Sequence, residues 1–120
     1  MKAIVAVLFL AIASSSFAVT CPGTDNALLR YVRSAGGCDK AAALAEACTT
    51  ARYPAPAQAA LDICAGEVGG LTGNDARLMR TLEDRCDQAF QAGNVVVGLL
   101  NIYCKIEATK FMRTVTNAEL

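Results

Sequence analysis

Hydrophobic residues recur every three to four positions along most of the chain, which is the spacing of amphipathic helices rather than of strands. Glycine or proline interrupts this pattern at four places, and each interruption is a signal for a helix to end or begin. The pattern predicts an all-α fold, a small bundle of four to five helices. The expected helical segments are residues 24–37, 38–53, 56–70, 72–92 and 95–120.

Capping residues and prolines support the first three of these helices. Thr24 or Asp25 can cap the first helix. Asp39 is expected to cap the second helix, whose alanine-rich body has a high helix propensity. Pro54 disfavours a helical conformation in the residue before it, and Pro56 fits the first turn of the third helix.

The fourth helix separates an apolar stripe from a charged face. The stripe consists of Leu78, Leu82, Cys86 and Ala89. The charged face carries Arg77, Arg80, Glu83, Asp84, Arg85 and Asp87. Opposite charges four residues apart on a helix usually mark a solvated surface, so the carboxylates of this face are not expected to form a catalytic pair.

The last helix contains the most apolar stretch outside the N-terminus, residues 94–104. Three consecutive valines favour a strand there, but the longer pattern is helical. One apolar stripe consists of Val97, Leu100, Cys104, Ala108, Phe111 and Val115, and a second, on the opposite side, of Val95, Leu99, Ile102 and Ile106. Because the first half of the helix is apolar nearly all round, we expect Val95–Ile106 to be buried at the centre of the bundle and Phe111–Leu120 to emerge at the surface.

The N-terminal residues 1–18 have the pattern of a secretory signal peptide. Lys2 precedes an apolar run, and Ser16 and Ala18 place small residues at a cleavage site. The run is too short to span a bilayer, so no membrane span is expected. Cleavage after Ala18 would leave residues 19–120 as a single disulfide-rich helical domain that is secreted to the extracellular space.

The charge of the mature chain is close to zero. The full chain has 11 basic and 11 acidic residues, and loss of Lys2 leaves 10 against 11, a net charge of −1. A near-neutral chain lacks the basic surface that nucleic-acid binding requires. It also lacks the basic polar face of a membrane-lytic amphipathic helix.

Six cysteines in a short secreted chain predict three disulfides. They are Cys21, Cys38, Cys48, Cys64, Cys86 and Cys104. The chain has no histidine, and no two of its cysteines have the C-x-x-C spacing of a zinc or redox motif. We therefore expect no metal site and no cofactor.

The connectivity of these disulfides can be argued from helix geometry, because a short turn between antiparallel helices brings together residues equally far from the turn. The nearest pairs across two turns predict Cys48–Cys64 and Cys86–Cys104, and Cys21–Cys38 remains. The first helix lies between the last two cysteines and spans about 16 Å. If that separation is too large, both bridge to other helices and one of the other predicted pairs must also be broken.

The composition argues against an enzyme. A hydrolytic triad needs a nucleophile and a base, whereas the mature chain has Ser34 as its single serine and no histidine. The glycine-rich segment 69–73 lacks the lysine of a phosphate-binding loop and is better read as a turn between helices.

Two functions remain. The first is a secreted, cysteine-rich helical protein that acts by binding an extracellular protein or a cell-surface receptor, as a signal, effector, toxin-like ligand or matrix component. The alternative is an extracellular carrier that holds a small apolar ligand between its helices. The expected lining of that ligand site is Val95, Leu99, Ile102, Tyr103 and Ile106.

Overall fold

The computed structural model describes residues 20–91 and 93–118, and it confirms the small all-α bundle that the sequence predicts. The predicted signal peptide lies outside the described residues. The helices are α2 (Asp25–Arg33), α3 (Cys38–Cys48), α4 (Ala55–Glu67), α5 (Gly73–Ala89) and α6 (Val95–Ala118). No extended strand occurs in the described ranges.

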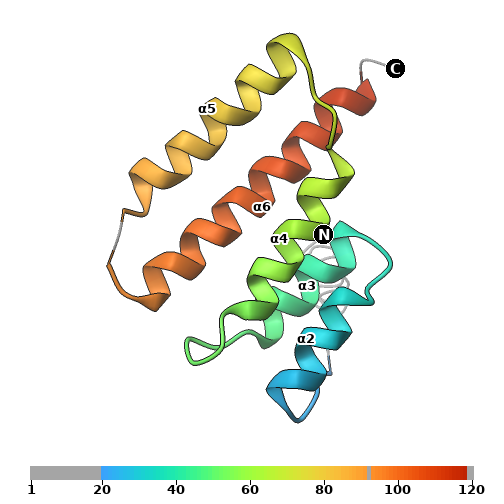
Figure 1. The fold of residues 1–120 in the computed structure, drawn as a ribbon, viewed down its shortest axis with the longest axis vertical. Coiled ribbons are helices and arrows are strands. Elements are labelled where there is room, and N and C mark those ends of the chain that lie inside the picture. Colours follow the sequence, from blue (N-terminus) through green and yellow to red (C-terminus); the bar gives the residue numbers. More distant parts are fainter. Residues whose placement is uncertain (1–19, 92, 119–120) are drawn as a thin grey trace, which may run out of the picture.

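The C-terminal helix α6 lies between α4 and α5 (Figure 1). Helices α2, α3 and α4 pack against one another, and α6 packs along α4 and touches α3. Helix α5 packs against α6 and, within the described part of the chain, against no other helix. The bundle therefore consists of a three-helix group, α2–α4, and a helical hairpin, α5–α6.

The helix starts agree in part with the predicted caps. The Thr24 side chain accepts a hydrogen bond from the Ala27 amide at 3.2 Å, which confirms the first cap. The prediction that Asp39 caps α3 is wrong, because this helix begins at Cys38, with Gly37 as its N-cap, and Asp39 lies in its first turn. The Cys38 amide donates instead to the Glu67 carboxylate of α4 at 2.6 Å.

The core of α2–α4 is built largely from small side chains. Val32 on α2 is completely buried, and the core positions of α3 and α4 are mostly alanines. The buried alanines of this core are Ala41, Ala42, Ala45, Ala57, Ala59 and Ala60. Small side chains let helix backbones approach closely, and the Cα atoms of Cys38 and Cys64, which link α3 to α4, are 4.5 Å apart.

Helix α6 forms as predicted, and the expected distribution of its buried residues is confirmed only in part. Leu99 and Ile106 are buried and Phe111 is 51 % exposed, as expected. Val95, Val96 and Leu100, in the first half, are 48, 53 and 44 % exposed, and Met112, in the second half, is fully buried, which the prediction did not give. The alternation of polar and apolar residues misses these positions, because it cannot show how far a neighbouring helix extends.

The position of α3 explains this difference. Its last turn lies near Tyr103, whose hydroxyl donates to the Ala45 carbonyl at 3.3 Å, and its first turn lies near Arg113, which pairs with Asp39. Helix α3 therefore runs antiparallel to residues 103–113 only. The first turns of α6 extend beyond its end, which leaves their apolar side chains uncovered on that side.

The three disulfides form, but only one has the predicted partners. The bridges are Cys21–Cys48, Cys38–Cys64 and Cys86–Cys104. The bridge between α5 and α6 is confirmed. The predicted pairs Cys48–Cys64 and Cys21–Cys38 are wrong.

Equal distance from the turn holds for a different pair of cysteines. Cys38 lies 11 residues before Thr49 and Cys64 lies 10 residues after Pro54, so these two are nearly equidistant from the turn between α3 and α4. Cys48 lies at the end of α3 and pairs with Cys21, which precedes α2. The alternative in which Cys21 and Cys38 each bridge to other helices is the one that the structure adopts.

Candidate interaction surface

The hairpin α5–α6 has a polar side, which the Cys86–Cys104 bridge helps to position. Asp87, next to the bridge on α5, accepts hydrogen bonds from Lys105 at 2.8 Å and from Asn101 at 3.0 Å. The hydrogen bond from Lys105, followed by that from Asn101, lowers the pKa of the Asp87 carboxyl below its usual value. This network fixes the rotation of α5 relative to α6.

The opposite side of the hairpin is apolar and exposed. Leu78 precedes Asp87 by nine residues, which is two and a half helical turns, so it lies on the other side of α5. On α6, Leu100 and Phe111 lie within about 40° and 60° of Val96 around the helix axis. We call the exposed side chains of Leu78, Val96, Leu100 and Phe111 the outer α5–α6 face.

The exposure of this face is large for hydrophobic side chains. Phe111 is 51 % exposed, Val96 is 53 % exposed and Leu78 is 36 % exposed. The charged groups beside them include Glu107 of α6, which pairs with Lys110 at 3.3 Å. Glu107 lies between Leu100 and Phe111 along this side of α6, so the face consists of apolar side chains on either side of a charged group.

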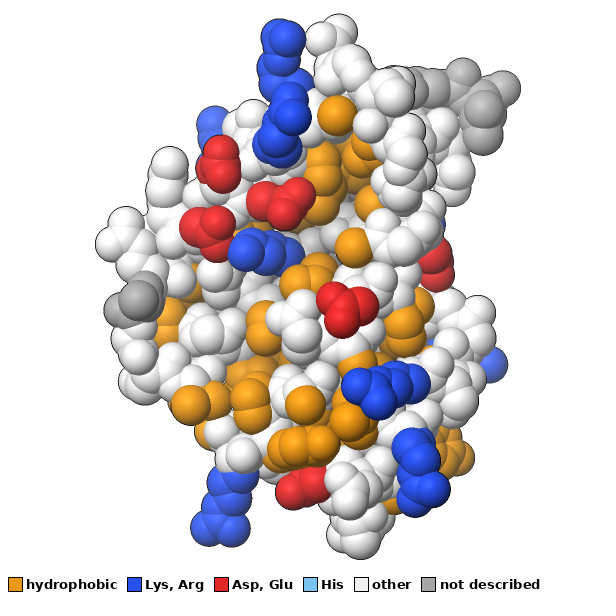
Figure 2. Space-filling model, in the orientation of Figure 1, with side chains coloured by type: hydrophobic (Ala, Val, Ile, Leu, Met, Phe, Trp, Pro, Cys, Tyr) orange, Lys and Arg blue, Asp and Glu red, His pale blue; other side chains and the backbone are white. Residues whose placement is uncertain are grey.

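Charged and hydrophobic side chains are also separated on the side of the molecule drawn in Figure 2. Acidic and basic groups gather there over α5, and hydrophobic groups gather mainly in the lower half of the view. This side includes the charged face of α5 that the sequence predicts. Its surface is consistent with the solvated role expected for those carboxylates.

The residues predicted to line a ligand site are divided between core and surface. Leu99 and Ile106 belong to the buried core, and Ile102 and Tyr103 pack against it, whereas Val95 is 48 % exposed. The first four lie where α6 meets α3 and α4. Burial raises the pKa of the Tyr103 hydroxyl, which is held by the Ala45 carbonyl.

A hollow beside the turn between α5 and α6 is lined by other residues. Phe90, Val97 and Gly98 provide its apolar part, and Asp87 and Asn101 provide polar groups. Asp87 is already bound to Lys105 and Asn101. The hollow therefore adds no free charge with which a ligand could be held.

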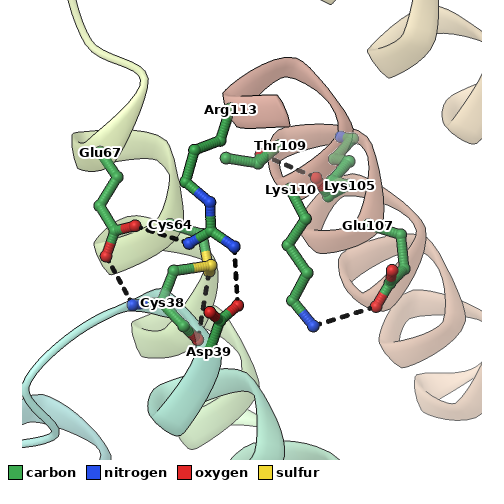
Figure 3. Close-up of a disulfide and its surroundings, with 9 residues drawn as sticks. All are labelled: Cys38, Asp39, Cys64, Glu67, Lys105, Glu107, Thr109, Lys110 and Arg113. Atoms are coloured by element: carbon green, nitrogen blue, oxygen red, sulfur yellow. Dashed lines mark hydrogen bonds and ion pairs between the residues drawn. A yellow bond between two sulfur atoms is a disulfide. The ribbon is translucent and has the colours of Figure 1, made fainter. Parts of the chain in front are cut away.

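A cluster that the sequence did not predict joins the ends of three helices beside the Cys38–Cys64 bridge (Figure 3). Arg113 of α6 donates to Asp39 of α3 at 2.8 Å and to Glu67 of α4 at 2.9 Å. Because these residues are 28 to 74 positions apart in the chain, no local spacing could have revealed the cluster.

The charges of this cluster stabilise one another. The hydrogen bond from Arg113 lowers the pKa of the Asp39 carboxyl below its usual value. The hydrogen bonds to Asp39 and then to Glu67 raise the pKa of the Arg113 guanidinium. Glu67 also accepts from the Cys38 amide, so its two oxygens connect Arg113 with the first turn of α3.

In the described residues, no three histidine, cysteine, aspartate or glutamate side chains are grouped as metal ligands would be. Of the described helices, none has the length and apolar character needed to cross a membrane. The chain matches no protein-family model, no curated protein and no solved structure. A function for the chain therefore has to be inferred from its own surface.

Proposed function

We propose that the chain is a secreted, non-catalytic protein that binds an extracellular protein or a cell-surface receptor through the outer α5–α6 face. The observation that carries this proposal is the exposure of four large hydrophobic side chains on one side of a disulfide-linked hairpin. Exposed hydrophobic side chains that gather on one side of a protein with polar groups beside them can form an interaction site. The cross-linked hairpin keeps these side chains in place, which lowers the entropic cost of binding.

Secretion is supported by the disulfide content. Three bridges account for all six cysteines, and disulfides of this kind persist in oxidising compartments. The signal-peptide pattern of residues 1–18 agrees with that compartment. N-terminal sequencing of material secreted by expressing cells is expected to begin at Val19, and a start at Met1 would contradict this part of the proposal.

The binding test uses substitutions on the outer face together with a matched control. Leu100→Asp and Phe111→Asp each replace an apolar side chain of the face by a charge, and we expect each to weaken saturable binding to cells or extracellular proteins of the source organism at least tenfold. Tyr31→Asp is the control, because Tyr31 is 57 % exposed but lies on α2. Circular dichroism is expected to show the same helix content in all three variants.

The result can contradict the proposal in two ways. Binding that Tyr31→Asp weakens as much as Phe111→Asp would place the contact elsewhere on the surface. Saturable binding that both substitutions on the outer face leave unchanged would exclude this face. Surface plasmon resonance against immobilised extracellular fractions gives the affinities for both comparisons.

A further inference from the structure

The three-helix group and the hairpin are each closed covalently, but no disulfide connects one to the other. Two bridges lie within residues 21–64, and the third lies within residues 86–104. The two parts meet along a seam where α6 packs on α4 and touches α3. Only non-covalent contacts and the chain between α4 and α5 hold the seam together.

We propose that α5–α6 opens as a unit away from α2–α4, with the connection at residues 68–72 as the hinge and the Arg113 ion pairs as the clasp. Opening would expose the apolar side chains of the seam while both parts keep their disulfides. The inference concerns a conformational change of the fold and does not depend on the proposed partner or on the outer α5–α6 face.

The connection between α4 and α5 has the backbone of a hinge. Gly70 has a φ of +85°, a value that residues with a side chain rarely adopt, and Gly73, the first residue of α5, has a φ of +59°. A Cβ atom at Gly70 would have no heavy atom within 4 Å, so packing does not hold this position. Rotation of the hairpin would be concentrated in this short segment.

The seam is part of the hydrophobic core. On the α6 side Leu99 and Ile106 belong to the same buried cluster as the core residues of α2–α4, and Ile102 and Tyr103 pack against it. Because hydrophobic stabilisation scales with buried apolar area, opening is a rare event, and hydrogen exchange detects such events.

The ion pairs of the described residues show where the clasp lies. Lys105–Asp87 and Lys110–Glu107 are both contained within α5–α6. The two pairs that cross the seam both involve Arg113. The Arg113 side chain is 28 % exposed and holds one carboxylate from α3 and one from α4, so its removal releases both contacts at once.

Hydrogen exchange can test this opening, because a detached helix pair exchanges its amides rapidly. Helices of this length depend on tertiary packing, whereas α2–α4 would keep two disulfides. We expect Arg113→Ala to accelerate amide exchange in α5 and α6 about three- to fivefold, as the loss of one ion-pair cluster implies. Exchange in α2–α4, away from the seam, is expected to stay as in the wild type.

Two further variants make the test specific. Glu107→Ala removes a neighbouring charge of α6 whose ion-pair partner, Lys110, lies on the same helix, and it is expected to leave exchange unchanged. Glu67→Gln can still accept from the Cys38 amide but loses its charge toward Arg113, and it is expected to accelerate exchange in α5–α6 less than Arg113→Ala does. Equal acceleration in both parts of the molecule, or no response to Arg113→Ala, would overturn the proposal.

Discussion

The α2–α4 group and the α5–α6 hairpin differ in how they are stabilised and in which side chains they expose. The group contains three short helices, two disulfides and a core of alanines. The hairpin contains two long helices and one disulfide, and it leaves large hydrophobic side chains exposed. Small domains bury a limited fraction of their surface, and covalent cross-links compensate for this.

The two parts also differ in where their apolar residues lie. In α2–α4 the apolar residues lie inside, and the alanines permit a close approach of the backbones. In α5–α6 apolar residues such as Val96 and Phe111 contribute little to the core, because α5 covers only one side of α6. Substitutions in the first part should therefore change mainly stability, and substitutions on the outer face of the second should change mainly binding.

The largest effect is expected from removing the buried bridge of the α2–α4 group. Cys38→Ala with Cys64→Ala should lower the free energy of unfolding by about 3–4 kcal/mol, because the closed loop is long and both cysteines are buried. Urea denaturation followed by circular dichroism measures the loss.

The Cys21–Cys48 bridge is a matched control for that change. Its sequence separation is 27, against 26 for Cys38–Cys64, so the loop-closure entropy of the two is nearly equal. Cys21 is exposed, and removing this bridge disturbs less packing. Equal losses of stability in the two double variants would show that burial of the bridge has no effect.

Removing the bridge of the hairpin is expected to act locally. The Cys86–Cys104 bridge closes no loop in α2–α4, so Cys86→Ala with Cys104→Ala leaves the disulfides of that group in place. Helix α5 packs only against α6 among the described helices. Stability should fall by about 3 kcal/mol at most, with α5 losing its amide protection first. Hydrogen exchange measured helix by helix checks this, and uniform loss of protection in both parts would contradict the comparison.

A smaller effect is expected from shortening a side chain at the seam. Ile106→Ala removes a fully buried side chain and should cost about 2–3 kcal/mol. Phe111→Ala, on the same helix but half exposed, should cost about 0.5 kcal/mol or less. Thermal unfolding of the two variants measures both losses of stability. Similar losses would mean that Phe111, on the outer α5–α6 face, belongs to the core.

The helices and the bridge of the hairpin could be predicted from the sequence, because both depend on local spacing. The cap of α3 could not be predicted, since the group that satisfies the Cys38 amide is Glu67, 29 residues away. Asp39, which has the right residue type for a cap, lies in the first turn of the helix and binds Arg113 instead. A local rule fails where a distant side chain competes for the same backbone group.

The candidate site was predictable only in part. The apolar pattern of α6 was visible, but which of its faces is covered depends on how α3, α4 and α5 pack around it, and that is a property of the packed bundle. Leu99 and Ile106 became core residues for this reason, whereas Leu100 and Phe111 remained at the surface. The α3–α4 bridge was predictable in principle, because Cys38 and Cys64 are nearly equidistant from the intervening turn.

The smallest effect is expected from acid, and it distinguishes the same two parts. The pKa values of Asp39, at the seam, and of Asp87, inside the hairpin, are both lowered by hydrogen bonds from a basic residue. A lowered carboxyl pKa contributes stability above the unfolded value of about 3.9, and this contribution is lost as the pH falls through the folded value. Stability should therefore decrease below about pH 4 and not at higher pH.

Asparagine substitutions at Asp39 and Asp87 test how much each part of the molecule contributes to this acid sensitivity. Asp39→Asn should reduce the acid-induced exchange of the whole hairpin, because it removes a titrating group that crosses the seam. Asp87→Asn should reduce acid sensitivity only at the contact between α5 and α6. Since Asp39 is largely exposed, the effect at neutral pH should stay below about 1 kcal/mol and weaken in high salt. Acid titrations followed by hydrogen exchange measure both variants, and a wild-type protein that becomes more stable between pH 5 and pH 3 would contradict the sign of the prediction.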